Sequence, residues 1–396
     1  MLERKGESMT SELLVSKERM IGLDVIRGFA VLGIFFVNVP EMIGIGNAFE
    51  PSYRGLDAFI RLIYDMLFQT KFYSIFAFLF GVGFYLFFEN AERQGKRPRI
   101  LFMRRLLLLM VLGIGHAVLL WFGDILYTYA ILGFLLLIFY KRSPKTILVW
   151  SLILSGLFGL FIILATFALG LSKELSKPLF THIPDWGERI DFLLGSGLGN
   201  AASLSFEILG LFLLGLYAGK KSWFEHKELN VTVVHRVHMS AFILSILLFI
   251  PMVHYYSSHP VYMPMELYPY THFTGKTMAI FYICTLLLMI HRYGIQRFSS
   301  LAAVGRMTLT NYLVQSILTM LLLQVFWNYV NRLPLWVGMV YSVAVVVIII
   351  FWSKLWLHHY RMGPLEWLWR AGTYGQWPAL NRKQGVATGG TPTTKA

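Results

Sequence analysis

Four polar side chains of this very apolar chain are suited to proton chemistry: His116, Glu207, Asp124 and Asn38. An imidazole takes up a proton near neutral pH, and a neighbouring carboxylate orients the ring and stabilises its charge. At a rise of about 1.5 Å per residue, all four lie at similar depth, near the outer ends of the helices expected to carry them. The sequence predicts His116 as a general base, with Glu207 or Asp124 as the orienting acid.

Each of these residues also has a purely structural interpretation. A single intramembrane histidine often bonds the backbone of a neighbouring helix, and Glu207 is also compatible with a protonated, uncharged state. Asp124 stands where a helix begins, so it is also a candidate helix cap. Asn38 is equally compatible with an interhelical hydrogen bond.

A second polar group is expected at the opposite, cytoplasmic side. Asp24 and Arg27 are three residues apart and share a helical face, which predicts an ion pair. Arg306, Arg104 and Arg105 join them, and guanidinium forks bind phosphates bidentately. This group is a candidate site for a phosphorylated donor such as acyl-coenzyme A, or for a lipid head group. The alternative is that Arg104 and Arg105 only extend to the cytoplasmic surface.

Two further patterns concern the interior of the expected bundle. Asn311 and Gln315 are four residues apart on one helical face, so we expect them, with Asp24, to line an interior pocket. The outer segment with His254, His259 and His272 has metal-capable side chains but no recognised ligand spacing. We therefore expect no metal site.

Composition defines the elements that must position these residues. Of 396 residues, 56% are hydrophobic and 14% are charged, about half the charged share of a soluble domain. The chain cannot cover a water-facing surface of this size, which excludes a soluble enzyme and a disordered chain. The one cysteine, Cys284, excludes an intramolecular disulfide and a cysteine-based zinc site.

Apolar runs of about 20 residues predict an all-α, polytopic membrane protein with ten spans. They cover residues 21–39, 72–89, 101–121, 125–140, 146–171, 201–219, 237–253, 272–290, 307–329 and 335–357. Most Lys and Arg residues fall in alternate connecting segments, which predicts that both termini are cytoplasmic. The net charge of +14 then follows from topology, and no nucleic-acid partner is expected.

The chain divides into four predicted parts. Residues 1–20 form a cytoplasmic segment, 21–219 an amino-terminal membrane half, 220–381 a carboxy-terminal membrane half and 382–396 a disordered tail. We expect no cleaved signal peptide and find no internal repeat. Residues 56–69 alternate Asp57, Arg61 and Asp65 with apolar residues, which predicts an amphipathic helix lying at the outer interface.

Several short motifs resemble the YeiB-type bacterial membrane proteins, and together they cover nearly the whole chain. The first span carries Gly22-Leu23-Asp24-Val25-Ile26-Arg27-Gly28 and ends with Asn38. The other matches are Lys71-Phe72-Tyr73-Ser74-Ile75-Phe76, Phe80-Gly81-Val82-Gly83, His116 with Gly123-Asp124-Ile125-Leu126, Gly305-Arg306-Met307-Thr308-Leu309-Thr310-Asn311-Tyr312 and Gly363-Pro364-Leu365-Glu366-Trp367.

The amino-terminal half is also similar to transmembrane acyltransferases of the heparan-glucosaminide N-acetyltransferase kind. This resemblance implies a ten-helix core that moves an acyl group from cytoplasmic acyl-coenzyme A to an acceptor across the membrane, with Asn38 as a functional position. Those proteins have a catalytic histidine soon after that asparagine, whereas residues 38–56 here contain none. Either His116 takes that role, or the chain performs no acyl transfer.

The sequence thus favours an acyltransferase-like protein of the bacterial cytoplasmic membrane. Its expected partners are membrane lipids and an extracytoplasmic envelope sugar or lipid as acceptor. The alternatives are a transporter or exporter of a small amphipathic metabolite, and a non-enzymatic envelope scaffold. The buried polar residues are compatible with either an enzyme or a transporter, so composition does not separate these two classes. The sequence does not define the acceptor, the acyl length or the oligomeric state.

Overall fold

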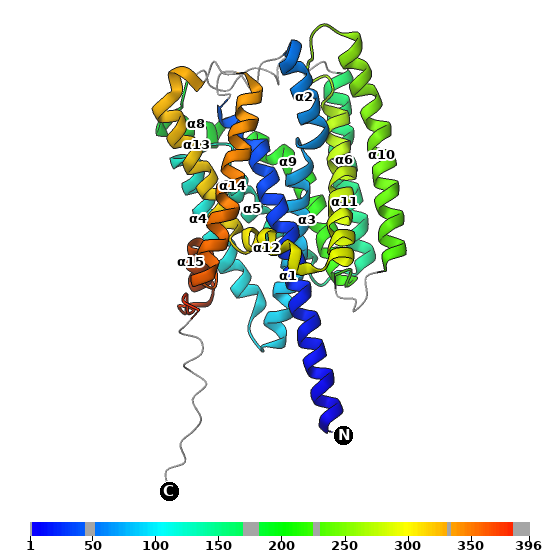
Figure 1. Cartoon of the computed structure of the whole chain (residues 1–396), viewed down its shortest axis with the longest axis vertical. Helices are drawn as coiled ribbons and strands as arrows, with labels where there is room; N and C mark the ends of the chain where they lie inside the picture. Colours follow the sequence, from blue (N-terminus) through cyan, green and yellow to red (C-terminus); the bar gives the residue numbers. More distant parts are fainter. Residues whose placement is uncertain (1, 44–51, 169–181, 225–229, 331–333, 383–396) are drawn as a thin grey trace.

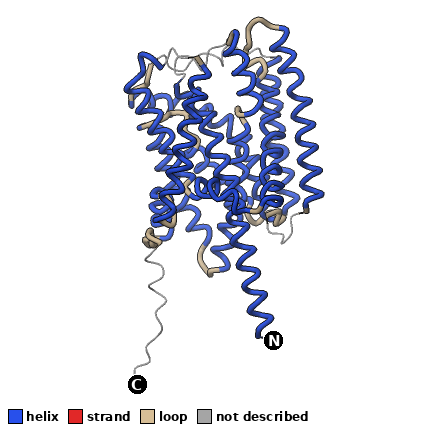
Figure 2. Tube along the Cα trace, in the orientation of Figure 1, coloured by secondary structure: helices blue, strands red, loops and turns tan. Residues whose placement is uncertain are grey.

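The computed structural model describes residues 2–43, 52–168, 182–224, 230–330 and 334–382. Within these ranges the regular elements are helices, most of them running along one direction of a single bundle (Figures 1 and 2). The prediction of an all-α polytopic membrane protein is confirmed.

The first half of the bundle contains helices of very different length. They are α1 (Leu2–Ile43), α2 (Gly55–Leu67), α3 (Lys71–Arg93), α4 (Pro98–Leu119), α5 (Leu126–Phe139), α6 (Pro144–Ile163) with the π-helical extension η1 (Leu164–Ala168), α8 (Trp186–Phe192) with η2 (Leu193–Gly197), and α9 (Leu198–Lys220). The second half has α10 (Val231–Ser258), α11 (Tyr268–Tyr293), η3 (Ile295–Phe298), α12 (Ser299–Arg306), α13 (Thr308–Val330), α14 (Leu335–His359) and α15 (Pro364–Tyr374).

Eight stretches of the described chain are long and apolar enough to cross a membrane, and they contain most of eight predicted spans. They are Ile21–Ile43, Gly55–Arg93, Pro98–Leu119, Pro144–Phe167, Val231–Ser258, Tyr268–Tyr293, Thr308–Phe326 and Leu335–His359. The other two predicted spans correspond to α5, which has only 14 residues, and to α9, which packs between α3 and α6.

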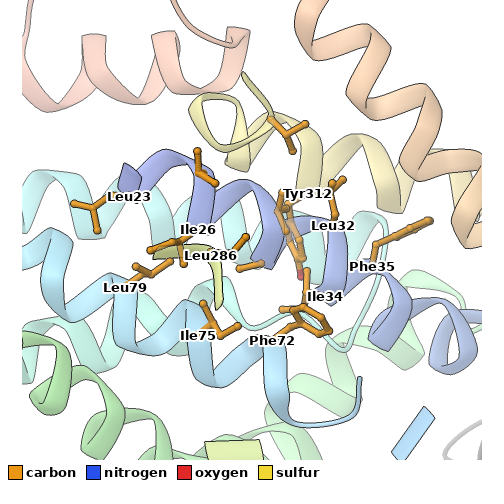
Figure 3. Close-up of a cluster of buried hydrophobic side chains, with 14 of the residues drawn as sticks. Leu23, Ile26, Leu32, Ile34, Phe35, Phe72, Ile75, Leu79, Leu286 and Tyr312 are labelled. Carbon is orange, nitrogen blue, oxygen red and sulfur yellow. The ribbon is translucent and has the colours of Figure 1, made fainter. Parts of the chain in front are cut away.

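Helix α1 forms the centre of the core. Val25, Ile26 and Ala30 are fully buried, and α1 packs against α3, α11, α12, α13 and α14. Gly28 allows the closest approach, because a Cβ there would lie 2.0 Å from the Leu301 carbonyl oxygen of α12. Figure 3 shows residues of α1 and α3 meeting Tyr312 of α13 in this core.

Helix α2 is amphipathic, as predicted, but its polar face is turned into the protein. The Arg61 and Asp65 side chains are 11% and 2% exposed and form an ion pair with a 3.1 Å N–O distance. Leu56 and Phe59 are exposed instead. Helix α2 packs against α10, α11 and α14. In this position the Asp65 carboxylate accepts a hydrogen bond from the Tyr262 hydroxyl at 2.9 Å.

The two ends of the bundle differ. Helix α15 and the amino-terminal part of α1 lie at one end, and α2 and α8 lie at the other (Figure 1). The predicted amino-terminal segment, apart from Met1, is helical and continues α1 without a break. Apart from Arg382, the predicted disordered tail lies outside the described residues.

Candidate functional site

His116 and Asp124 meet where α4 ends and α5 begins. His116 Nδ1 lies 2.9 Å from Asp124 Oδ1, and both side chains are fully buried. A short turn after α4 returns the chain toward the same helix, and Gly113 permits this because a Cβ there would lie 2.4 Å from the Tyr127 nitrogen. We call these two residues the His116 pair.

Asp124 uses its two carboxylate oxygens for different purposes. Oδ2 accepts hydrogen bonds from the Leu126 and Tyr127 amides at 2.8 and 3.2 Å, which caps the start of α5. Oδ1 lies 2.9 Å from His116 Nδ1, and an imidazole that carries its proton on Nδ1, toward this carboxylate, keeps its lone pair on Nε2. Both ring nitrogens of His116 are buried and neither makes a hydrogen bond of good geometry among the described residues, so the 2.9 Å contact with Asp124 is the one that Nδ1 has there. Asp124 is therefore both a helix cap and the partner of the histidine.

Tyr312 completes this arrangement and was not predicted as a site residue. Its hydroxyl donates to Asp124 Oδ1 at 3.2 Å, and its ring centroid lies 5.1 Å from that of His116. The sequence offered one signal, because Tyr312 closes the motif that begins at Gly305. The motif alone does not show that it contacts a residue 188 positions away.

Glu207 contacts a different set of residues. Its carboxylate forms an ion pair with Lys276 of α11, and Glu207 Oε2 lies 3.7 Å from His272 Nε2. The Lys276 ammonium also donates to the His272 carbonyl oxygen at 2.9 Å. We call Glu207, Lys276 and His272 the Glu207 cluster. The sequence analysis did not pair Glu207 with either partner.

The two groups approach each other through tyrosines. The Tyr73 hydroxyl of α3 interacts with Glu207. Tyr129 of α5 donates from its hydroxyl to the Tyr73 carbonyl oxygen at 3.2 Å. A polar connection therefore extends from the Glu207 cluster toward the helix that Asp124 caps.

Asn38 is partly buried near the outer end of α1. It lies one helical turn before Met42, which packs with Trp121 and Phe122 of the turn after α4. Asn38 thus shares the face of α1 that is directed toward this turn.

At the end of the bundle where α15 lies, the predicted ion pair between Asp24 and Arg27 is confirmed, with a 2.8 Å N–O distance. Arg306 interacts electrostatically with Asp24 and donates to the Arg361 carbonyl oxygen. Asp24 therefore lies between two arginines.

Arg105 and Arg104 have different environments. The Arg105 guanidinium lies over the Trp369 ring of α15, 3.9 Å from its centroid, and interacts electrostatically with Arg27. Arg104 is exposed. Arg105 and Arg306 therefore each interact with one member of the Asp24–Arg27 pair, whereas Arg104 lies at the surface.

Asn311 and Gln315 join helices. Asn311 Nδ2 donates to Ser353 Oγ of α14 at 2.9 Å, and Gln315 Nε2 donates to the Val31 carbonyl oxygen of α1 at 3.3 Å. Their side-chain oxygens, Asn311 Oδ1 and Gln315 Oε1, are buried without hydrogen-bond partners among the described residues. Among all the described residues, no three His, Cys, Asp or Glu side chains form a group that could hold a metal ion.

Glu366 of α15 occupies the start of α13. Its Oε1 accepts hydrogen bonds from the Leu309 and Thr310 amides at 2.6 and 3.1 Å, and Oε2 accepts from Thr310 Oγ1 at 2.6 Å. Burial raises the pKa of Glu366, and these hydrogen bonds oppose the rise. Thr310 and Glu366 come from two of the quoted motifs, so the structure gives these motifs a helix-docking role.

The fold and the buried ionisable groups define a multi-pass membrane protein with charged side chains inside its helical bundle. The chain belongs to the YeiB-type family of bacterial membrane proteins. Residues 218–376 match the family described as "Protein of unknown function (DUF418)".

Full-length relatives support this assignment. The chain is 30% identical over 408 residues to "Uncharacterized protein YxaH" of Bacillus subtilis (strain 168), covering 94% of this chain and 98% of that protein. It is 32% identical over 382 residues to "Uncharacterized 39.9 kDa protein in amylase 3'region" of Bacillus acidopullulyticus, covering 93% and 97%. "Uncharacterized protein YeiB" of Escherichia coli (strain K12) is 27% identical over 399 residues, covering 89% and 96%. The predicted family is confirmed.

Proposed function

We propose that this protein is a membrane acyltransferase of the bacterial cytoplasmic membrane that uses acyl-coenzyme A on the cytoplasmic side and an envelope sugar or lipid as acceptor. The observation that carries the proposal is the His116 pair. Asp124 Oδ1 lies 2.9 Å from Nδ1, and Nε2 is buried without a partner among the described residues; a carboxylate beside one ring nitrogen and a free second nitrogen are what a general base requires.

The base has a defined task in this reaction. His116 Nε2 takes the proton of an acceptor hydroxyl while the acceptor oxygen attacks the thioester carbonyl carbon. The carbon–sulfur bond then breaks, and the imidazolium returns the proton to the thiolate sulfur. Asp124 stabilises the imidazolium between these two steps. Atoms and charge balance without any further reactant.

The cytoplasmic arginines fit the donor. Asp24 pairs with Arg27 and interacts with Arg306, and Arg105 interacts electrostatically with Arg27. Glu366 is already bound at the α13 terminus, so it does not neutralise them by an ion pair. Phosphates are the anions that guanidinium groups bind best.

Helix α13 connects the two sites. Arg306 is the last residue of α12, and Tyr312 is the fifth residue of α13, about 6 Å along its axis from the first at 1.5 Å per residue. An extended pantetheine arm spans such a rise, so a donor held at the arginines brings its thioester toward the His116 pair.

Binding and turnover of acyl-coenzyme A test this function on the purified full-length protein. We expect saturable binding that is lost in Arg306→Ala and kept in Arg99→Ala, which removes an exposed arginine at the start of α4. His116→Gln should bind the donor normally and lose turnover by about 10²- to 10⁴-fold. Full turnover in folded His116→Gln would remove the base assignment.

The alternative, a transporter of a small amphipathic metabolite, is favoured by the Glu207 cluster. Ionisable residues inside membrane helices mark substrate and ion pathways, and Glu207 and Lys276 pair across α9 and α11. The binding experiment separates the classes, because absence of donor binding with several acyl lengths supports transport.

A further inference from the structure

Three nitrogen atoms at the outer end of α4 are buried without a hydrogen-bond partner among the described residues: the donors Trp121 Nε1 and Arg189 Nε, and His116 Nε2. His116 is in the last turn of α4, Trp121 is in the turn that follows, and Arg189 reaches the same end from α8. The three residues are 2%, 2% and 5% exposed. Buried polar atoms without hydrogen-bond partners destabilise the folded state, so these three atoms need an explanation.

Arg189 is the charged member of this cluster. Its Nη1 donates to the Val118 carbonyl oxygen at 3.0 Å, which places a cation at the carboxy-terminal end of α4. Asp185 is the acid that interacts with it, but Asp185 is exposed and its Oδ1 accepts from the Glu188 amide at 2.9 Å. The Val118 carbonyl oxygen at the end of α4 accepts the hydrogen bond of Arg189 Nη1. Among the described residues, Nε has no acceptor and the positive charge has no ion-pair partner.

The outer surface of α8 indicates where this cation lies. Trp186, Ile190 and Leu194 follow one another at helical spacing and are 65%, 43% and 70% exposed. An exposed apolar stripe with tryptophan is typical of a segment at the membrane interface. Arg189 belongs to the same helix and has its side chain buried, so it is at the depth of lipid head groups, where phosphate is the common anion.

We propose that the outer end of α4, with Arg189, Trp121 and His116, is a binding site for a phosphate-bearing ligand, supplied by the head group of an anionic lipid. The phosphate oxygens accept from Arg189 Nε and Trp121 Nε1, and a hydroxyl on the same head group lies against His116 Nε2. A role of this ligand as the acyl acceptor rests on the proposed function. Binding of the ligand at this site does not depend on that function.

The test uses the purified full-length protein in nanodiscs of phosphatidylcholine, with or without phosphatidylglycerol, and measures the thermal unfolding midpoint. We expect phosphatidylglycerol to raise the midpoint, and Arg189→Gln to abolish the rise. Arg54→Gln, which removes an exposed arginine next to α2 at the same end of the bundle, should keep it. An equal rise in wild type and Arg189→Gln would overturn the site.

Two milder variants cover the case in which Arg189→Gln does not fold. Arg189→Lys keeps the charge and loses the Nε donor, and Trp121→Phe loses only the indole donor. Each should reduce the rise, and a full rise in both would overturn the site. Glycerol 1-phosphate added to phosphatidylcholine discs distinguishes the source, because stabilisation by this soluble probe identifies a free phosphate ligand and also supports the site.

Turnover separates this inference from the proposed function. Lipid-dependent stabilisation without any acyl transfer would leave the phosphate site and remove the acyltransferase. Acyl transfer that is identical with and without phosphatidylglycerol, together with no lipid-dependent stabilisation, would leave the acyltransferase and remove the phosphate site.

Discussion

The His116 pair and the Glu207 cluster are both buried, and each joins a histidine to a carboxylate, yet they differ in what remains free. In the Glu207 cluster, the carboxylate is neutralised by Lys276, and that ammonium also binds the His272 carbonyl oxygen. In the His116 pair, the described residues place no cation beside the carboxylate, and none of them hydrogen-bonds His116 Nε2. The first arrangement balances charge inside the membrane, whereas the second is suited to exchanging a proton with a substrate.

Exchanging the acid in each group gives the largest expected difference. Asp124→Asn replaces the acceptor that holds His116 Nδ1, so turnover of acyl-coenzyme A should fall by about 10²- to 10⁴-fold. Glu207→Gln should change turnover only a few-fold in protein that folds. Steady-state kinetics on both variants check this. A larger loss of turnover in Glu207→Gln than in Asp124→Asn would make Glu207 the orienting acid. That role would require the helix that carries Glu207 to move toward His116.

Charge removal tests the balancing role of Glu207. Lys276→Met leaves a buried, unpaired carboxylate, which we expect to cost about 3–5 kcal/mol of unfolding free energy. The double variant Glu207→Leu with Lys276→Met removes both charges and should recover most of that loss. Unfolding in mixed detergent micelles measures both values. Additive losses in the double variant would contradict a self-neutralised pair.

Tyr312→Phe tests the third member at the His116 pair. The variant keeps the ring in the core and removes the hydroxyl that donates to Asp124 at 3.2 Å. A hydrogen bond to a charged group contributes about 1.5–3 kcal/mol, so the unfolding free energy should fall by that amount. Tyr341→Phe is the matched control, since its hydroxyl bonds to a neutral group, Thr319 Oγ1 at 3.2 Å. An equal loss in the two variants would remove the special role of Tyr312.

The sequence predicted the spans well because one physical quantity decides them. A run of about 20 apolar residues must cross the membrane or be buried, wherever its neighbours lie. The Asp24–Arg27 pair was equally accessible, since residues three apart on a helix are neighbours in any fold. Both inferences need only local geometry.

The partners of the buried charges could not be read in the same way. Lys276 follows Glu207 by 69 positions on another helix, and no sequence period connects the two. Helix α2 shows the same limit, because its period shows that Arg61 and Asp65 share a face and does not show that this face turns inward. The expected depth in the membrane placed His116 near both Asp124 and Glu207. Only the folded structure shows that Asp124 contacts His116 and that Glu207 contacts Lys276 instead.

Glu366 is a third kind of buried carboxylate, held by backbone amides rather than by a cation or a histidine, and it should give the smallest effect. Burial raises its pKa in the folded protein, so the folded state binds the proton more tightly than the unfolded state. Stability should therefore decrease as pH rises from about 4.5 through the folded pKa of Glu366.

Glu366→Gln keeps an oxygen acceptor for the Leu309 and Thr310 amides and has no charge to bury, so it should remain docked and lose this pH dependence. Glu366→Ala leaves those amides without an acceptor and should weaken the docking of α15 at every pH. Hydrogen exchange of the α13 amides between pH 5 and 8 measures both variants. If wild type and Glu366→Gln changed equally with pH, the titrating group would lie elsewhere, and Glu366 would be a cap without electrostatic consequence.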